Sequence, residues 1–138
     1  MTRDNPKLVA GSWTLQLPPV DREVLVRYAS ASGDRNPLHL DTAAARAAGE
    51  DDVIAHGMLS MAYLGRLLTE AFPHAELAEW QLRFVAKTPL GAKPTAHAQV
   101  SAERYDGFDV EIRTELQDGT ITGRGGARFS FNRHGDEI

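Results

Sequence analysis

Cysteine is absent from this sequence. None of its 138 residues is a cysteine, which excludes disulfides, thiolate catalysis and cysteine-ligated metal. Long apolar runs are missing as well, since none approaches the roughly 20 residues that a membrane-spanning helix needs. Residues 1–7 lack the basic-then-apolar order of a signal peptide. We therefore expect a cytoplasmic protein that is not embedded in a membrane.

An excess of positive charge is also missing. The chain has 15 Lys and Arg against 19 Asp and Glu, a formal net charge of −4, and no basic block occurs along it. Nucleic acid is therefore not the expected partner. A hydrophobic fraction of 42% and a charged fraction of 25% are ordinary for a globular protein, and the length predicts one domain over residues 1–138.

The first half of the chain contains three helical patterns. Asp21 can cap the first helix, which Gly33 ends, and Asp41 or Thr42 can cap a second, alanine-rich helix. The acidic stretch that follows is expected to be a solvated loop. The segment at residues 55–72 is the most hydrophobic, with apolar side chains around most of its circumference. Such a helix is usually buried inside a domain.

The second half shows strand-like alternation instead. A short strand is predicted at residues 13–17, and four longer runs lie at residues 80–88, 94–105, 108–116 and 120–131. Asp-Gly pairs at residues 106–107 and 118–119 predict hairpins between neighbouring runs. We expect an α+β fold in which a curved antiparallel sheet, including a four-strand meander, wraps around the long buried helix.

The first candidate for chemistry is the stretch Gly-Asp-Arg-Asn-Pro-Leu-His at residues 33–39. Asp and His are the side chains best suited to move protons near neutral pH. Pro37 fixes its own φ and biases Asn36 towards an extended backbone, so the segment is a bent loop. That loop is either a plain turn or a holder for Asp34 and His39 as an acid–base pair.

The second candidate is the start of the hydrophobic helix, where the chain reads Ile-Ala-His-Gly-Met at residues 54–58. The first N–H groups of a helix lack internal partners and lie at the positive end of its dipole. Gly57 has no side chain, so a carbonyl or anionic oxygen can approach its N–H, as in an oxyanion hole. The alternative is that Gly57 only permits close helix packing. A metal site formed by His39, Asp41 and His56 also stays open, although no known metal spacing is present.

Taken together, residues 28–41 and 54–59 resemble the MaoC-like (R)-specific enoyl-CoA hydratase family. Its members, also called hydratase 2, are hot-dog-fold proteins, and related 3-hydroxyacyl-ACP dehydratase subunits are similar. The pattern Gly-Asp-x-Asn-Pro-x-His followed by Ala-His-Gly-Met carries the resemblance, which spans most of the chain. Residues 42–54 resemble the segment that overhangs the acyl pocket in this family. Some members carry a serine where this chain has Gly65.

The resemblance implies a reversible hydration of trans-2-enoyl thioesters to (R)-3-hydroxyacyl thioesters, without metal or organic cofactor. Asp34 and His39 would hold the water, and the Gly57 N–H would stabilise charge on the thioester oxygen. Residues Asn36, His56 and Met58 would support the site or bind the substrate.

The partners that the resemblance implies are an acyl-CoA or acyl-carrier-protein thioester, as in fatty acid metabolism, and a second subunit. A homodimer is expected, and a heterodimer is the alternative. Two other functions stay open: an acyl-CoA thioesterase on the same fold, and a non-catalytic acyl-binding subunit of a heterodimeric dehydratase.

Overall fold

The computed structural model describes residues 5–9 and 11–131. Within them the helical segments are α1 (Arg22–Ser32), the short 3-10 helix η1 (Pro37–His39), α2 (Thr42–Ala47) and α3 (Gly57–Ala71). The strands are β1 (Lys7–Val9), β2 (Ser12–Gln16), β3 (Ala75–Phe84), β4 (Thr95–Arg104), β5 (Gly107–Glu115) and β6 (Ile121–Phe131).

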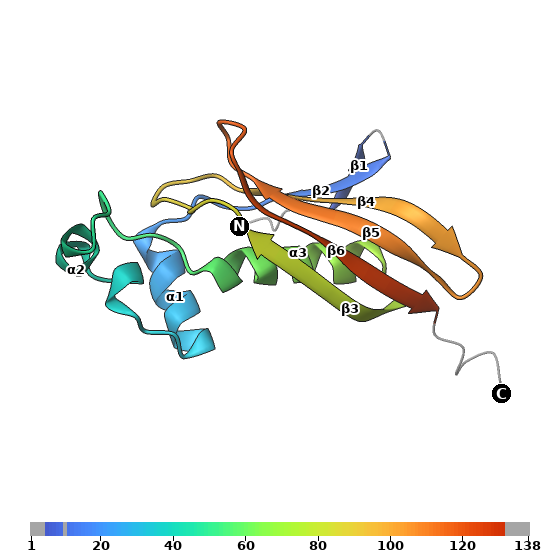
Figure 1. Ribbon diagram of the computed structural model, residues 1–138, viewed down its shortest axis with the longest axis horizontal. Helices are drawn as coiled ribbons and strands as arrows, with labels where there is room; N and C mark the ends of the chain where they lie inside the picture. The colour runs from blue at the N-terminus through green and yellow to red at the C-terminus, as the bar shows by residue number, and fades with distance from the viewer. Residues whose placement is uncertain (1–4, 10, 132–138) are drawn as a thin grey trace.

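The strands form one antiparallel sheet in the order β1-β2-β4-β5-β6-β3. Helix α3 lies against one face of this sheet, while α1 and α2 gather at one end of the molecule (Figure 1). Inward and outward residues alternate along the strands: Val110, Ile112 and Thr114 of β5 are buried, and the residues between them are less so. The predicted α+β architecture is confirmed.

The predicted four-strand meander is correct for β4, β5 and β6 and wrong for β3. Strand β3 pairs with β6, so that Trp80 lies opposite Ala127, and it does not neighbour β4. Residues 85–94 join β3 to β4 and are too long for a tight hairpin. They pass the end of the molecule where α3 begins, and the Ala55 N–H donates to the Thr88 carbonyl over 2.9 Å. Alternation predicts a strand, but it does not say which strand lies beside it.

Burial of α3 on all sides is a second expectation that the structure corrects. The side chains buried on α3 are those of Leu59, Ser60, Leu64, Leu67 and Leu68. Met58 is 54% exposed, and Ala62 is exposed as well. A single sheet covers only one side of a helix, which leaves the apolar residues of the other side uncovered in this chain.

Two separate hydrophobic clusters form the core. The larger lies between α3 and the sheet and includes Leu64, Leu67 and Phe129. The smaller lies under α1 and α2 and comprises Val20, Leu25, Ala45, Val53, Ala55 and Leu59. Tyr63 packs against both clusters, so α3 connects the sheet to the helical end of the molecule.

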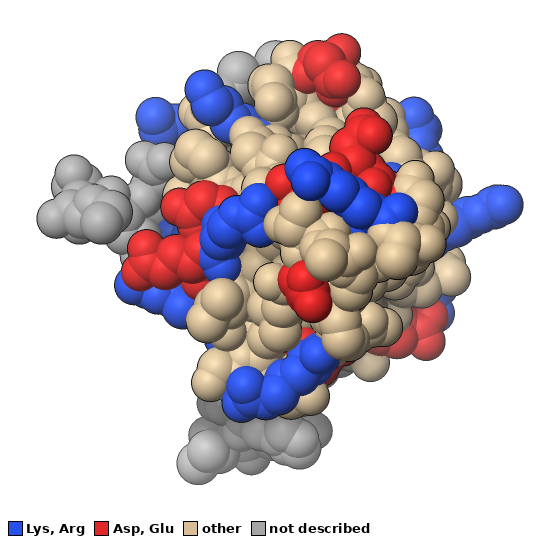
Figure 2. Space-filling model, turned by 90° about the vertical axis from the view of Figure 1, so that its left-hand side faces the viewer, with Lys and Arg blue, Asp and Glu red and all other residues tan. Residues whose placement is uncertain are grey.

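The surface at the helical end carries both signs of charge. Figure 2 shows Lys and Arg interspersed with Asp and Glu on this face, with no broad field of one sign. None of the helices in the described part of the chain is long and apolar enough to cross a membrane.

Candidate active site

The loop after α1 is fixed by short local hydrogen bonds. Gly33 ends α1 with a left-handed φ of 80°, which glycine adopts without strain. The Asn36 N–H donates to Oδ1 of Asp34 over 3.2 Å. Asn36 in turn caps η1, because its Oδ1 accepts from the Leu38 N–H over 3.0 Å. The loop is therefore bent as predicted, and Asp34 and Asn36 both shape it.

His39 faces Asp34 across a gap that suits a water molecule. Nδ1 of His39 lies 2.8 Å from the Ile54 carbonyl; because a carbonyl only accepts, Nδ1 carries a proton, and in the neutral ring the lone pair is then on Nε2. Nε2 lies 3.9 Å from Oδ2 of Asp34, and the two side chains are 12% and 52% exposed. This distance is too long for a direct hydrogen bond, and one water can bridge such a pair.

His56 contacts both members of this pair. Its Nε2–H donates to the backbone carbonyl of Asp34 over 3.0 Å, and its ring stacks on His39 with centroids 3.9 Å apart. Tyr28 also contacts the His56 ring, edge-on with centroids 4.8 Å apart. Burial lowers the pKa of His56 below its usual 6.5, against the opposing effect of its bond to Asp34. We infer that His56 is neutral and holds Asp34 and His39 in place.

The start of α3 directly follows His56 in the chain, and no side chain caps it. His56 is the N-cap residue, yet its side chain makes no capping bond. The first N–H groups of a helix have no carbonyl four residues earlier in the helix to accept from them. A Cβ atom placed on Gly57 would lie 3.4 Å from the Phe84 ring, so this ring covers one side of the glycine. Met58, also predicted as a site residue, is exposed on the first turn.

A metal could be held by Asp34, His39 and His56, which each offer a ligand atom within 4.8 Å of the others. Asp41, part of the set that the sequence left open, is not in this group. It caps α2 instead, since its Oδ1 accepts from the Ala43 N–H over 2.9 Å. Nδ1 of His39 and Nε2 of His56 already form hydrogen bonds with backbone carbonyl oxygens.

The acidic loop after α2 is less solvated than expected. Asp52 is 29% exposed and lies 2.8 Å from the Arg22 guanidinium of α1. Its other oxygen accepts from the Thr42 hydroxyl and the Val53 N–H, each over 2.7 Å. Hydrogen bonds from Thr42, from Val53 and from Arg22 lower the pKa of Asp52. Asp52 thus anchors the overhanging segment to α1, a role that charge in the sequence alone does not reveal.

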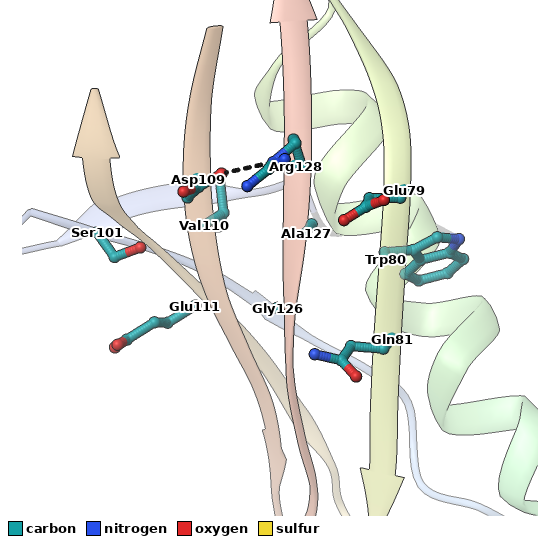
Figure 3. Close-up of a pocket in the computed structure, with 10 residues that line it drawn as sticks. All are labelled: Glu79, Trp80, Gln81, Ser101, Asp109, Val110, Glu111, Gly126, Ala127 and Arg128. Carbon is teal, nitrogen blue, oxygen red and sulfur yellow. Dashed lines mark hydrogen bonds and ion pairs between the residues drawn. The ribbon is translucent and has the colours of Figure 1, made fainter. Parts of the chain in front are cut away.

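Hollows in the described part of the chain lie away from the predicted residues, and two of them are described here. A groove of about 470 Å³ crosses the outer face of the sheet over Gly126, bordered by Glu79, Gln81 and the Asp109–Arg128 pair (Figure 3). A smaller cavity of about 240 Å³ lies beside the overhanging segment, between residues 50–54 and 89–90. Neither is lined by Asp34, His39 or Gly57.

Comparisons with known proteins define the family. A family model described as a MaoC-like domain matches residues 13–122. The chain therefore belongs to the MaoC-like family, and its fold is the hot-dog fold predicted from the sequence. An (R)-hydratase from A. caviae involved in PHA biosynthesis superimposes with a TM-score of 0.79 at 26% identity, over 90% of this chain and 98% of that one.

Two curated relatives are dehydratases. The chain is 35% identical over 108 residues, 78% of its length, to 3-hydroxyacyl-thioester dehydratase X of Mycobacterium tuberculosis. It is 34% identical over 82 residues, 59% of its length, to the mitochondrial 3-hydroxyacyl-[acyl-carrier-protein] dehydratase of Arabidopsis thaliana. The matches span 36% and 49% of the lengths of these two proteins.

Proposed function

We propose that this chain catalyses the reversible hydration of trans-2-enoyl thioesters to (R)-3-hydroxyacyl thioesters. The observation that carries the proposal is the 3.9 Å gap between Oδ2 of Asp34 and Nε2 of His39. A carboxylate and an imidazole lone pair at this separation can hold one water between them. The family membership and the dehydratase relatives support the same reaction.

In this reaction the water oxygen adds to C3 of the enoyl group. Asp34 is the principal base that takes the proton from this water, and His39 orients the water and takes part in moving the proton that reaches C2. Both steps occur on one face of the double bond, and attack of the water on one particular face of C3 gives the R configuration. Dehydration follows the same path in reverse. Because the two groups are coupled, their protons belong to the pair.

The negative charge that develops on the thioester oxygen during addition needs a hydrogen-bond donor to stabilise it. The Gly57 N–H at the start of α3 supplies it, aided by the positive end of the helix dipole. Asn36 supports the loop by capping η1, and His56 holds the backbone of Asp34. Met58, 54% exposed beside Gly57, offers an apolar contact for the substrate.

The proposed partner is a second copy of this chain. Strand β3 is an edge of the sheet formed by the described residues. Antiparallel pairing of two β3 strands about Gln81 would place Glu79 of each copy opposite Arg83 of the other, and opposite charges at such positions are favourable. It would also extend the sheet next to Phe84, which is 49% exposed.

Charge reversal tests this interface by light scattering during size exclusion. Arg83→Glu is expected to shift the dimer towards monomer, and Glu79→Arg combined with Arg83→Glu is expected to restore it. A dimer that is equally stable in the single variant would contradict this pairing.

Crotonyl-CoA tests the activity of the purified chain. Hydration removes the absorbance of the conjugated enoyl group and releases no thiol. Thiol release with the double bond intact would indicate a thioesterase instead. A folded chain that does neither alone, and gains activity only with a second protein, would be the non-catalytic subunit.

A further inference from the structure

A row of arginines crosses the outer face of the sheet. In the strand register, Arg113 of β5 lies directly opposite Arg124 of β6, and Arg124 lies directly opposite Arg83 of β3. Arg113 alternates with the buried side chains of Ile112 and Thr114, so it points away from α3. Residues directly opposite each other share a face of the sheet. All three guanidinium groups therefore project from the outer face.

This arrangement is unfavourable for the chain by itself. Like charges directly opposite each other on neighbouring strands are destabilising. Within the described part of the chain, neither Arg83 nor Arg124 forms an ion pair or a side-chain hydrogen bond. Arg113 lies 3.9 Å from a carboxylate oxygen of Glu115, which is too long for a hydrogen bond. In the dimer proposed above Arg83 would gain an acidic neighbour, yet Arg124 would keep an arginine on each side.

The row lines a hollow of about 500 Å³. Val85, Gln99 and Glu111 also contribute to its lining, and Glu111 borders the groove over Gly126 as well. A hollow of this size suits a small molecule. Three arginines against one glutamate make its charge positive, although the formal net charge of the chain is −4. The hollow is therefore suited to a small anion.

The other lining residues favour a nucleotide over a bare inorganic anion. Guanidinium groups bind phosphate oxygens through paired hydrogen bonds, and they also stack on flat rings. The carboxylate of Glu111 can accept from ribose hydroxyls, and the Gln99 amide can both donate and accept. Val85 is 48% exposed, which provides an apolar contact for a base.

We propose that the hollow over Arg83, Arg113 and Arg124 binds a nucleoside diphosphate. This site goes beyond the proposed hydration, since neither Asp34 nor His39 lines the hollow. Two sources share the chemistry of the ligand: a free nucleotide and the nucleotide part of coenzyme A. Arg124 contributes the central charge, because an arginine lies on each side of it.

The experiment measures ADP binding to the full chain by isothermal titration calorimetry. Arg124→Gln is expected to weaken this binding by roughly tenfold to a hundredfold, since it removes charge-assisted hydrogen bonds to phosphate. Because the same change relieves repulsion, it should raise the unfolding temperature of the free chain by roughly 1 to 4 °C. ADP should raise the unfolding temperature of the unmodified chain and leave that of the variant unchanged.

Arg128→Gln is the matched control. Arg128 lies on the same strand and is 55% exposed, but its Nε is 3.4 Å from Oδ1 of Asp109. Its charge is already paired within the chain, so this variant is expected to bind ADP as tightly as the unmodified chain does.

Coenzyme A, titrated in the same way, separates the two sources. Binding that is tighter than that of ADP and depends on Arg124 would identify coenzyme A as the ligand. Equal or weaker binding than that of ADP would identify a free nucleotide.

Three results would overturn the site. They are no binding of ADP or coenzyme A at millimolar concentration, equal ADP affinity in folded Arg124→Gln, and an equal loss of affinity in Arg128→Gln. Pyrophosphate that binds as tightly as ADP would overturn the assignment to a nucleotide. None of these measurements requires turnover, so failure of this site and failure of the proposed hydration are distinguished.

Discussion

Replacing Asp34 by asparagine removes the proposed base and changes little else. Oδ1 of Asp34 accepts from the Asn36 N–H over 3.2 Å, and the oxygen of an asparagine side chain can accept the same bond. The side chain is 52% exposed, so we expect the free energy of unfolding to change by no more than about 0.5 kcal/mol. An amide cannot take a proton from water. Loss of a general base lowers kcat by roughly 10²- to 10⁴-fold, or about 3 to 5 kcal/mol in the barrier.

The assay is the initial rate of crotonyl-CoA hydration, with thermal unfolding measured on the same preparations. Asp41→Asn is the matched control, since Asp41 is an exposed carboxylate that also bonds locally, to the Ala43 N–H. Asparagine caps helices about as well as aspartate, so this variant should keep full activity. A folded Asp34→Asn variant within tenfold of the unmodified rate would refute the assignment of the base.

Three further predictions concern the same site. Gly57→Ala should lower kcat on crotonyl-CoA by roughly tenfold or more, because the added methyl obstructs the approach of the thioester oxygen to the N–H; a normal rate in the folded variant would argue against a donor role. The lowered pKa of His56 means that the unfolded chain binds more protons, so stability should fall as pH drops below about 6.5. Urea midpoints measured from pH 8 to pH 5 should therefore decline less in His56→Gln, and equal declines would contradict this linkage. Dialysis against EDTA should leave kcat unchanged, because Asp34 and His39 perform the proton transfers; loss of activity that Zn²⁺ restores would instead point to a metal held at Asp34, His39 and His56.

Much of the loop at residues 33–41 could be predicted because its structure is set locally. Asp21 and Asp41 cap the helices that follow them, and Gly33 takes the left-handed conformation expected at a helix end. Each of these interactions spans only a few residues, so the residue types at short spacing determine it. The sequence left Asp41 and Thr42 open as the cap of α2, and in the structure Asp41 is the cap.

Interactions between residues far apart in the chain could not be predicted from the sequence. Phe84 lies beside Gly57 because β3 pairs with β6 and does not pair with β4. The alternation of residues along a strand does not show which strand lies next to it. Asp52 lies in an acidic run, which predicts a side chain exposed to solvent. In the structure it pairs with Arg22, which is 30 residues away. Pairings of this kind depend on how the elements pack, which single-sequence patterns do not specify.

The division of the core into two clusters has a consequence for how activity is lost. The Asp34 loop borders the smaller cluster, whose buried members are fewer than those of the cluster under the sheet. Regions with fewer buried apolar contacts open at lower free energy, ahead of global unfolding. Mild heat or denaturant should therefore separate Asp34 from Gly57 while the strands stay paired. Inactivation would then be a subglobal event, reversible on cooling, with amide exchange fast in α1 and α2 and slow in β5 and β6.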